Sequence, residues 1–360
     1  MAKEKAHKTR YCSVPRTPER PTGPNIGPAR LSILRYLGRK WINGTVLHYC
    51  FFNKPKEWTT REEEKDIVRK GFKIWMDVGI GIKFEEISSI SDAEVRIAFL
   101  RDGSTWSGVG TDILKYFGKD EMTMNFGWDL ILEDANGIDT AVHEIGHTCG
   151  FPHEHQNPKS GIQWNRAAVI DLFSGPPNNW DVDKIEHNIL NTIVPDLVEG
   201  SAWDPDSIMH YSFEKGLILK PEKYQNQPLI PAGGLSARDK EWVKTFYPPI
   251  TARDYQKLEL LKSQVMQLGP GEQKNYLFEA PYTDEFTFRT IGKSDTVMVL
   301  FEDQGANAEP RYIQGDDDSG EDRNALITAH LAKGSKYILR VRLYWAKRSG
   351  STAVIVEEAP

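Results

Sequence analysis

Two histidines four residues apart, His143 and His147, flank Glu144 in the segment HEIGHTCGFPHEH. Residues four apart lie one above the other on the same face of an α-helix, so the two rings can each direct a nitrogen at one point. Gly150 can adopt a positive φ, which would end the helix and turn the chain so that His153 reaches the same point. The spacing therefore predicts three imidazole ligands for one zinc ion per chain.

Three protein ligands leave one coordination position for water, whereas a structural zinc site is typically closed by four protein ligands. Glu144 follows a ligand in the sequence and so borders the metal without having to bind it. Its carboxylate can take the proton of a zinc-bound water, whose pKa falls to about 7, and pass it to the leaving amine. We therefore predict amide hydrolysis with Glu144 as the general base and no covalent intermediate.

The elements that position this motif follow from hydrophobic spacing. Residues 138–149 should form the helix that carries it, and residues 60–78 a second helix, because Ile67, Trp75 and Val78 recur at helical spacing. Further short helices are expected at 166–173 and 182–193, and one capped by Ser236 that ends at Pro248. Strands are expected within 41–52, 82–87, 94–100, 108–111 and 122–126. This order favours an α+β catalytic domain with a mixed sheet.

Composition along the chain divides it into four parts. Residues 1–40 are rich in Pro, Arg and Gly and should form an N-terminal arm, which is a candidate pro-segment. The peptidase domain should cover 41–250, and a charged linker helix 251–264. From 265 to 360 the pattern changes to alternating strands with Gly, Asp and Asn turns, which predicts an all-β sandwich domain.

Net charge, apolar runs and cysteine content argue against several classes of protein. The net charge of −6 gives no basic excess, so we expect no nucleic-acid partner. No run of eighteen apolar residues occurs, and the first residues lack the apolar segment of a secretory signal. We therefore expect no membrane span, and either export by a route without a visible signal peptide or a cytoplasmic location. Three cysteines spread over the chain argue against a disulfide framework.

The pattern HExxHxxGxxH resembles the metzincin metalloproteases, and GFPHEH followed by DPDSIMHYS resembles the astacin family in particular. The resemblance covers residues 40–248 and also includes STWSGVG, similar to the family's substrate-binding edge strand. It implies a Met-turn in which Met209 packs beneath the metal. It also implies that Tyr211 binds zinc in the resting enzyme and stabilises the oxyanion during turnover. The substrates it implies are proteins or peptides.

Two departures from the family concern the arm. The paired cysteines of its extracellular members are missing, and the family's aspartate-bearing pro-segment motif is not recognisable before Trp41. Cys12, in RYCSVP, could instead place a thiolate on zinc and hold the enzyme latent, as in cysteine-switch metzincins, or be a free thiol without a role. Glu154 resembles the residue that anchors the mature amino terminus, with a plain surface carboxylate as the alternative. His155 is expected at the surface or next to a ligand.

Residues 265–360 resemble the prepeptidase C-terminal β-sandwich of secreted bacterial peptidases. The acidic residues Asp316–Asp318 and Asp322 could hold calcium or form a solvated turn. Two other functions stay open. One is a zinc-stabilised recognition module with a vestigial protease fold; the other is a zinc hydrolase that acts on a non-peptide amide or ester.

Overall fold

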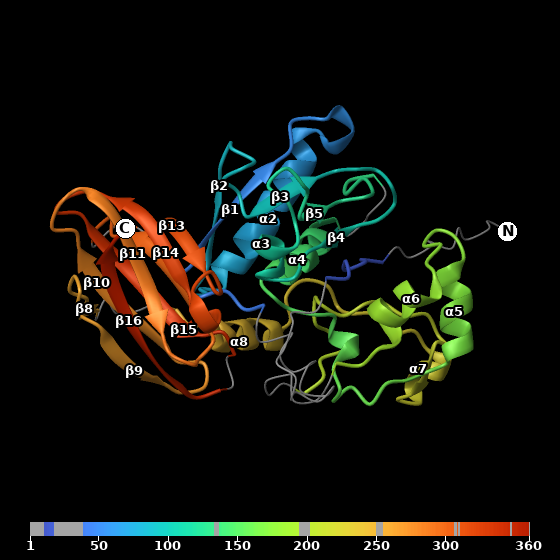
Figure 1. Ribbon diagram of the computed structural model, residues 1–360. Coiled ribbons are helices and arrows are strands. Elements are labelled where there is room, and N and C mark those ends of the chain that lie inside the picture. Colours follow the sequence, from blue (N-terminus) through green and yellow to red (C-terminus); the bar gives the residue numbers. More distant parts are fainter. Residues whose placement is uncertain are drawn as a thin grey trace. The chain divides into compact units, whose positions relative to one another are not determined.

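The structure is a computed structural model with two compact units, drawn in Figure 1. It describes residues 11–17, 39–132, 137–193, 202–249, 255–305, 308, 310–345 and 348–359. One unit comprises Met1–Arg39, Leu47–Ile80 and Phe84–Pro248, and the other Lys40–Val46, Gly81–Lys83 and Pro249–Pro360. Most of the predicted arm, residues 1–10 and 18–38, therefore lies outside the described residues. No described helix is both long and apolar enough to cross a membrane.

The first unit contains a five-stranded mixed sheet in the order β2-β1-β3-β5-β4. β1 pairs in parallel with β3, and β3 with β5, whereas β4 is antiparallel to β5 and forms one edge. The strands are β1 (Val46–Phe51), β2 (Lys83–Glu86), β3 (Val95–Ala98), β4 (Trp106–Ser107) and β5 (Met124–Asn125). The expected mixed sheet and the edge position of the STWSGVG segment are confirmed.

The strand expected at 108–111 is wrong. These residues turn into the short helix α3 (Asp112–Lys115), and Gly110 has a φ of +52°. A side chain at this position would lie 1.9 Å from the carbonyl oxygen of Arg39, so only glycine allows the close approach. The Gly110 N–H donates to the carbonyl oxygen of His147 at 2.9 Å, which ties the end of the edge strand to the motif helix.

The two expected helices, α2 (Glu62–Asp77) and α4 (Gly137–Thr148), are present and pack against each other. The fully buried ring of Trp75 donates from Nε1 to the carbonyl oxygen of Val142 at 2.9 Å. A Cβ at Gly71 would lie 2.9 Å from Ile145 Cδ1, so glycine permits the close crossing. Among the described residues, no side chain caps the start of α2, and the Thr60 hydroxyl donates to the buried carboxylate of Glu64.

Short elements follow the motif helix. They are η2 (Glu154–Gln156), β6 (Gln163–Trp164), α5 (Arg166–Ser174), α6 (Val182–Ile185), the π-helix η3 (Glu186–Leu190), β7 (Ile218–Lys220), α7 (Lys223–Asn226) and α8 (Ala237–Phe246); η1 (Lys56–Trp58) precedes α2. The cap expected for the last helix is confirmed, because Ser236 Oγ accepts from the Asp239 N–H at 2.9 Å. The Asp239 carboxylate accepts from the Ser236 N–H in return.

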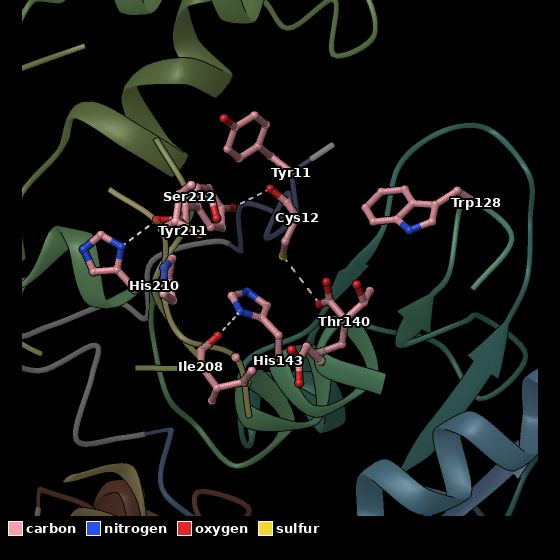
Figure 2. A pocket seen from close by; sticks show the side chains of 14 residues that line it. Tyr11, Cys12, Trp128, Thr140, His143, Ile208, His210, Tyr211 and Ser212 are labelled. Carbon is pink, nitrogen blue, oxygen red and sulfur yellow. Dashed lines mark hydrogen bonds between the residues drawn. The ribbon is translucent and has the colours of Figure 1, made fainter. Parts of the chain in front are cut away.

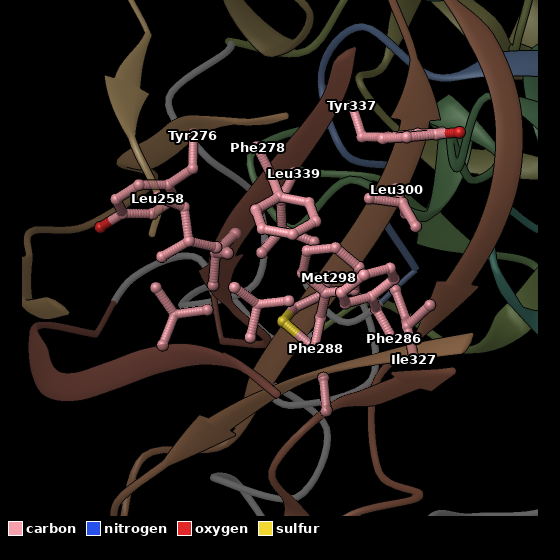
Figure 3. Close-up of a cluster of buried hydrophobic side chains, with 14 of the residues drawn as sticks. Leu258, Tyr276, Phe278, Phe286, Phe288, Met298, Leu300, Ile327, Tyr337 and Leu339 are labelled. Carbon is pink, nitrogen blue, oxygen red and sulfur yellow. The ribbon is translucent and has the colours of Figure 1, made fainter. Parts of the chain in front are cut away.

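The second unit is a β-sandwich, as expected. Its sheets have the orders β13-β12-β15-β10-β8 and β14-β11-β16-β9. Their buried faces meet in a core that includes Phe278, Phe286 and Phe288 (Figure 3). The strands are β8 (Gln256–Lys257), β9 (Gln264–Leu268), β10 (Gln273–Glu279), β11 (Asp284–Ile291), β12 (Thr296–Glu302), β13 (Arg311–Asp316), β14 (Leu326–Leu331), β15 (Lys336–Leu343) and β16 (Gly350–Glu358), with η5 (Glu321–Arg323) before β14.

The linker helix expected at 251–264 is wrong over residues 255–264, which contain no helix. Residues 251–254 lie outside the described part of the chain. β8 falls inside the expected helix and pairs in parallel with β10. Leu258 is buried in the sandwich core, and its N–H donates to the carbonyl oxygen of Leu277 at 2.8 Å. Burial against the sheet overrides the local helical pattern of charged residues.

Candidate active site

The motif helix α4 brings the first two histidines together. The rings of His143 and His147 lie 4.8 Å apart and almost perpendicular. Gly150 has a φ of +91° and ends the helix, so the chain turns back as the sequence suggests. His153 follows the turn and places its Nε2 3.1 Å from Nε2 of His147. The three predicted ligand rings thus converge on one buried point.

Backbone carbonyl groups fix the orientation of two of these rings. Nδ1–H of His143 donates to the carbonyl oxygen of Ile208 at 2.7 Å, and Nδ1–H of His147 to that of Phe151 at 2.7 Å. A carbonyl oxygen only accepts, so Nδ1 carries the proton and Nε2 keeps its lone pair. Within the described part of the chain, Nε2 of His143 has no hydrogen-bond partner. Both rings therefore present a lone pair to the shared point, as metal-binding imidazoles do.

The turn beneath the motif packs on the helix through Met209. A Cβ at Gly146 would lie 2.3 Å from Met209 Sδ, so the sulfur rests directly on the helix backbone. The carboxylate of Asp239, in α8, accepts from the Ser207 hydroxyl at 2.7 Å and from the Ile208 N–H at 2.9 Å. These bonds hold the turn, and with it the carbonyl group that orients His143. Met209 therefore packs against the motif helix, as the resemblance implies.

Tyr211 lies beside the three rings. Its hydroxyl is 2.9 Å from Nε2 of His153 and donates to the carbonyl oxygen of Cys12 at 2.5 Å. His155 is also buried, so the surface position considered for it is wrong. Nε2–H of His155 donates to the carbonyl oxygen of Asn188 at 2.9 Å, and its ring stacks on that of His153 at 5.3 Å. His155 therefore supports a predicted ligand instead of binding at the shared point.

Glu154, between those histidines, is partly buried. Its Oε1 accepts from the N–H of Asp204 at 3.0 Å and from the Asn157 side chain at 2.9 Å. Burial raises the pKa of its carboxyl group to about 7. The alternative of a plain surface carboxylate is therefore wrong.

The described part of the arm places Cys12 in the same cluster (Figure 2). Its Sγ lies 3.5 Å from His147 Nε2 and 3.5 Å from Glu144 Oε2. The donor atoms of Cys12, His143, His147 and His153 all lie within 4.8 Å of one another. Sequence reasoning connected Cys12 with the motif only through the resemblance to cysteine-switch enzymes, because the 130 positions between Cys12 and His143 carry no spacing signal.

The electrostatics of the cluster suit a cation. Burial raises the pKa of Glu144 to about 8, and burial and the Glu144 carboxylate raise the pKa of the Cys12 thiol. Burial lowers the pKa of His143 to about 4, so this ring is neutral at pH 7. A bound cation would supply the positive charge that favours the ionised forms of Cys12 and Glu144, which burial otherwise disfavours. This donor set fits Zn²⁺, which binds imidazole nitrogen and thiolate sulfur in tetrahedral sites.

A cavity of about 230 Å³ opens beside this cluster. Its lining includes Cys12, His143, Glu144 and Tyr211 from the cluster. Its remaining walls include Trp128, Asp139, Thr140, Ile208, Ile230 and Pro231. In Figure 2, Trp128 and Tyr211 lie on opposite sides of Cys12. Sequence reasoning missed Tyr11, Trp128 and Asp139, because their sequence surroundings contain no recognisable motif.

Comparisons with known proteins agree with this site. The Matrixin peptidase family model matches residues 40–164. The solved structure of myroilysin is 30% identical in sequence, with a TM-score of 0.51, over 58% of this chain and 96% of that chain. Metalloendoproteinase 1-MMP of Arabidopsis thaliana is 27% identical over 165 residues, which cover 36% of this chain and 44% of that protein.

Human tolloid-like protein 1 is 35% identical over 89 residues. That match covers 24% of this chain and 8% of the relative. The chain thus spans less than half the length of these two curated relatives but nearly all of myroilysin. With the matching fold and the metal-binding motif, these similarities show that the chain belongs to the metzincin-type family of zinc metallopeptidases.

Proposed function

We propose that this protein is a zinc-dependent endopeptidase that is held latent by its own arm. The observation that carries the proposal is the cluster of three histidine nitrogens and the Cys12 sulfur, with Glu144 beside it. In this proposal His143, His147 and His153 hold the zinc ion, and Cys12 occupies the position that water takes in the active enzyme.

Glu144 acts as the general base. When bound, zinc lowers the pKa of a coordinated water and polarises the carbonyl group of the substrate. Oε2 of Glu144 lies 3.5 Å from the Cys12 sulfur. The carboxylate would therefore face a water molecule that takes the place of this sulfur. A buried carboxylate whose pKa is raised toward neutrality can accept a proton and later donate it to the leaving amine.

Tyr211 supplies a hydroxyl donor for the oxyanion. In the latent form this hydroxyl donates to the carbonyl oxygen of Cys12, so a carbonyl group of an extended segment already lies where the donor can reach it. A substrate carbonyl in a similar position would receive the same hydrogen bond as its oxygen gains negative charge. The resting-state role of Tyr211 as a zinc ligand belongs to the form without the arm.

Main-chain pairing favours peptides over other amides. The N–H of Ser13 donates to the carbonyl oxygen of Thr105 at 2.9 Å, one residue before the edge strand β4. The arm thus uses the hydrogen bonding by which extended peptides add to a sheet edge. A small amide or ester lacks the neighbouring N–H groups that this edge can bind.

The test measures zinc content and cleavage of an unfolded protein by the full chain, Cys12→Ser and Cys12→Ser/Glu144→Ala. We expect about one zinc per chain in all three, low cleavage by the unaltered chain, a clear increase with Cys12→Ser and loss of that increase with Glu144→Ala. Zinc without any cleavage, even after arm removal, would support the recognition module. Hydrolysis of small esters but not of peptides would support the non-peptide hydrolase.

A further inference from the structure

The lining of the cavity beside the proposed metal site includes one acidic side chain, Asp139, that the mechanism does not use. Asp139 lies four residues before His143 on α4, so the two side chains share one helix face, one turn apart. Neighbouring Cβ atoms at this spacing are about 5–6 Å apart. Asp139 and the predicted zinc ligand His143 therefore border the same cavity from one face of α4.

The chain holds this carboxylate in a fixed place. Oδ1 of Asp139 accepts from the Gly234 N–H at 3.0 Å. Gly233 has a φ of +86°, and a Cβ there would lie 2.8 Å from Asp139 Oδ2, so glycine lets the loop pass against the carboxylate. These contacts restrict the side chain before any ligand binds, which reduces the entropy cost of recognition.

The surroundings of Asp139 suit a long cationic side chain. Trp128, Ile208, Ile230 and Pro231 provide apolar wall, which can cover a methylene stem. Apart from Glu144, which serves as the base, Asp139 is the one acidic residue among the described lining residues, and none of those residues is Lys or Arg. A carboxylate on the wall of a partly apolar cavity attracts a cation more strongly than one in open water.

We infer that this cavity binds the side chain of a substrate lysine or arginine next to the cleaved bond, and that Asp139 is the specificity-determining residue. The effect of this cavity on cleavage specificity rests on the proposed function. Ligand binding to the cavity can be tested without turnover, because the cavity is present with the arm in place.

The first test maps cleavage sites on a peptide library with the full chain carrying Cys12→Ser. We expect Lys and Arg to be enriched about tenfold or more at one position beside the cut bond, as a partly buried, charge-assisted hydrogen bond allows. Asp139→Asn keeps an oxygen for Gly234 and should remove the enrichment, whereas the matched control Asp171→Asn, an exposed acid on α5, should keep it. Enrichment that is absent, or that survives in Asp139→Asn, would overturn the inference.

The second test separates this inference from the peptidase proposal. The full, unaltered chain is titrated with the acetylated amides of lysine, arginine and norleucine, and binding is followed by NMR. We expect lysine or arginine to bind about tenfold more tightly than the uncharged norleucine, and the difference to vanish in Asp139→Asn. Equal binding of all three would refute the cation site. Preferential binding in a chain that cleaves nothing would refute the peptidase and keep the site.

Discussion

The prediction with the clearest physical basis concerns Tyr11, which anchors the arm beside Cys12. Only 6% of its surface is exposed, and its ring lies 4.6 Å from Phe173, 5.3 Å from Tyr211 and 6.3 Å from Phe213. These rings belong to the body of the first unit, so the contacts form only while the arm is seated. Tyr11→Ala should therefore shift the arm toward the open form.

The magnitude follows from the buried ring. A buried aromatic side chain removes about 150–250 Å² from water, worth about 4–6 kcal/mol at 25 cal/mol per Å². Measured truncations of buried aromatic residues to Ala cost about 3–5 kcal/mol. If about 3 kcal/mol of this cost falls on arm seating, the ratio of open to seated arm rises roughly a hundredfold.

Two assays report the open fraction. The first is the rate at which iodoacetamide labels Cys12, identified by mass spectrometry, because the seated thiol is buried. The second is basal cleavage of a quenched peptide by the full chain with zinc. Both should rise strongly in Tyr11→Ala and change little in Tyr11→Phe, which keeps the ring contacts. If Tyr11→Ala matches the unaltered chain in both assays while Cys12→Ser is active, Tyr11 is no anchor.

Three shorter predictions test the surroundings of the site. Gly146→Ala places a Cβ 2.3 Å from Met209 Sδ and should lower the free energy of unfolding by about 1–3 kcal/mol, measured by urea denaturation. Tyr211→Phe, in the Cys12→Ser chain, should lower kcat about 10²-fold with little change in KM; an unchanged kcat would exclude an oxyanion role for the hydroxyl. The hydrogen bond to Glu94 raises the pKa of His48 in the folded chain. The stability that this bond contributes is fully present below the unfolded pKa of about 6.5, and it is lost as pH rises through the folded pKa. His48→Gln should therefore destabilise the chain more at pH 5.5 than at pH 8.5 in urea titrations.

The sequence predicted those features whose cause is local. The motif helix, its end at Gly150 and the return of His153 all follow from spacing and from one residue's backbone freedom. The cap at Ser236 and the alternating strands of the sandwich are of the same kind. Each depends on residues within one or two turns of each other, so its physical basis can be read from a short segment.

Features with distant causes could not be predicted in this way. The strand expected at 108–111 fails because Gly110 meets the backbone of Arg39, far away in the sequence. The expected linker helix fails because Leu258 is buried in a sandwich whose strands follow it in the chain. Likewise, the carbonyl group of Ile208 that orients His143 comes from a turn 65 residues away.

In the proposed latent form, the arm blocks the site in three ways that substitutions can separate. The Cys12 sulfur lies 3.5 Å from Nε2 of His147, the Cys12 carbonyl oxygen accepts the hydrogen bond of the Tyr211 hydroxyl, and the Ser13 N–H donates to Thr105 beside the sheet edge. Cys12→Ser removes only the first of these, since the main-chain groups remain.

The double variant Tyr11→Ala/Cys12→Ser should therefore cleave peptides faster than Cys12→Ser alone, and the gain should appear mainly as a lower KM, because an arm segment competes with substrate for the same main-chain groups. Tyr11→Phe/Cys12→Ser is the matched control and should behave as Cys12→Ser. Equal KM values for all three would mean that the sulfur alone maintains latency and that the arm leaves the sheet edge as soon as its thiol is lost.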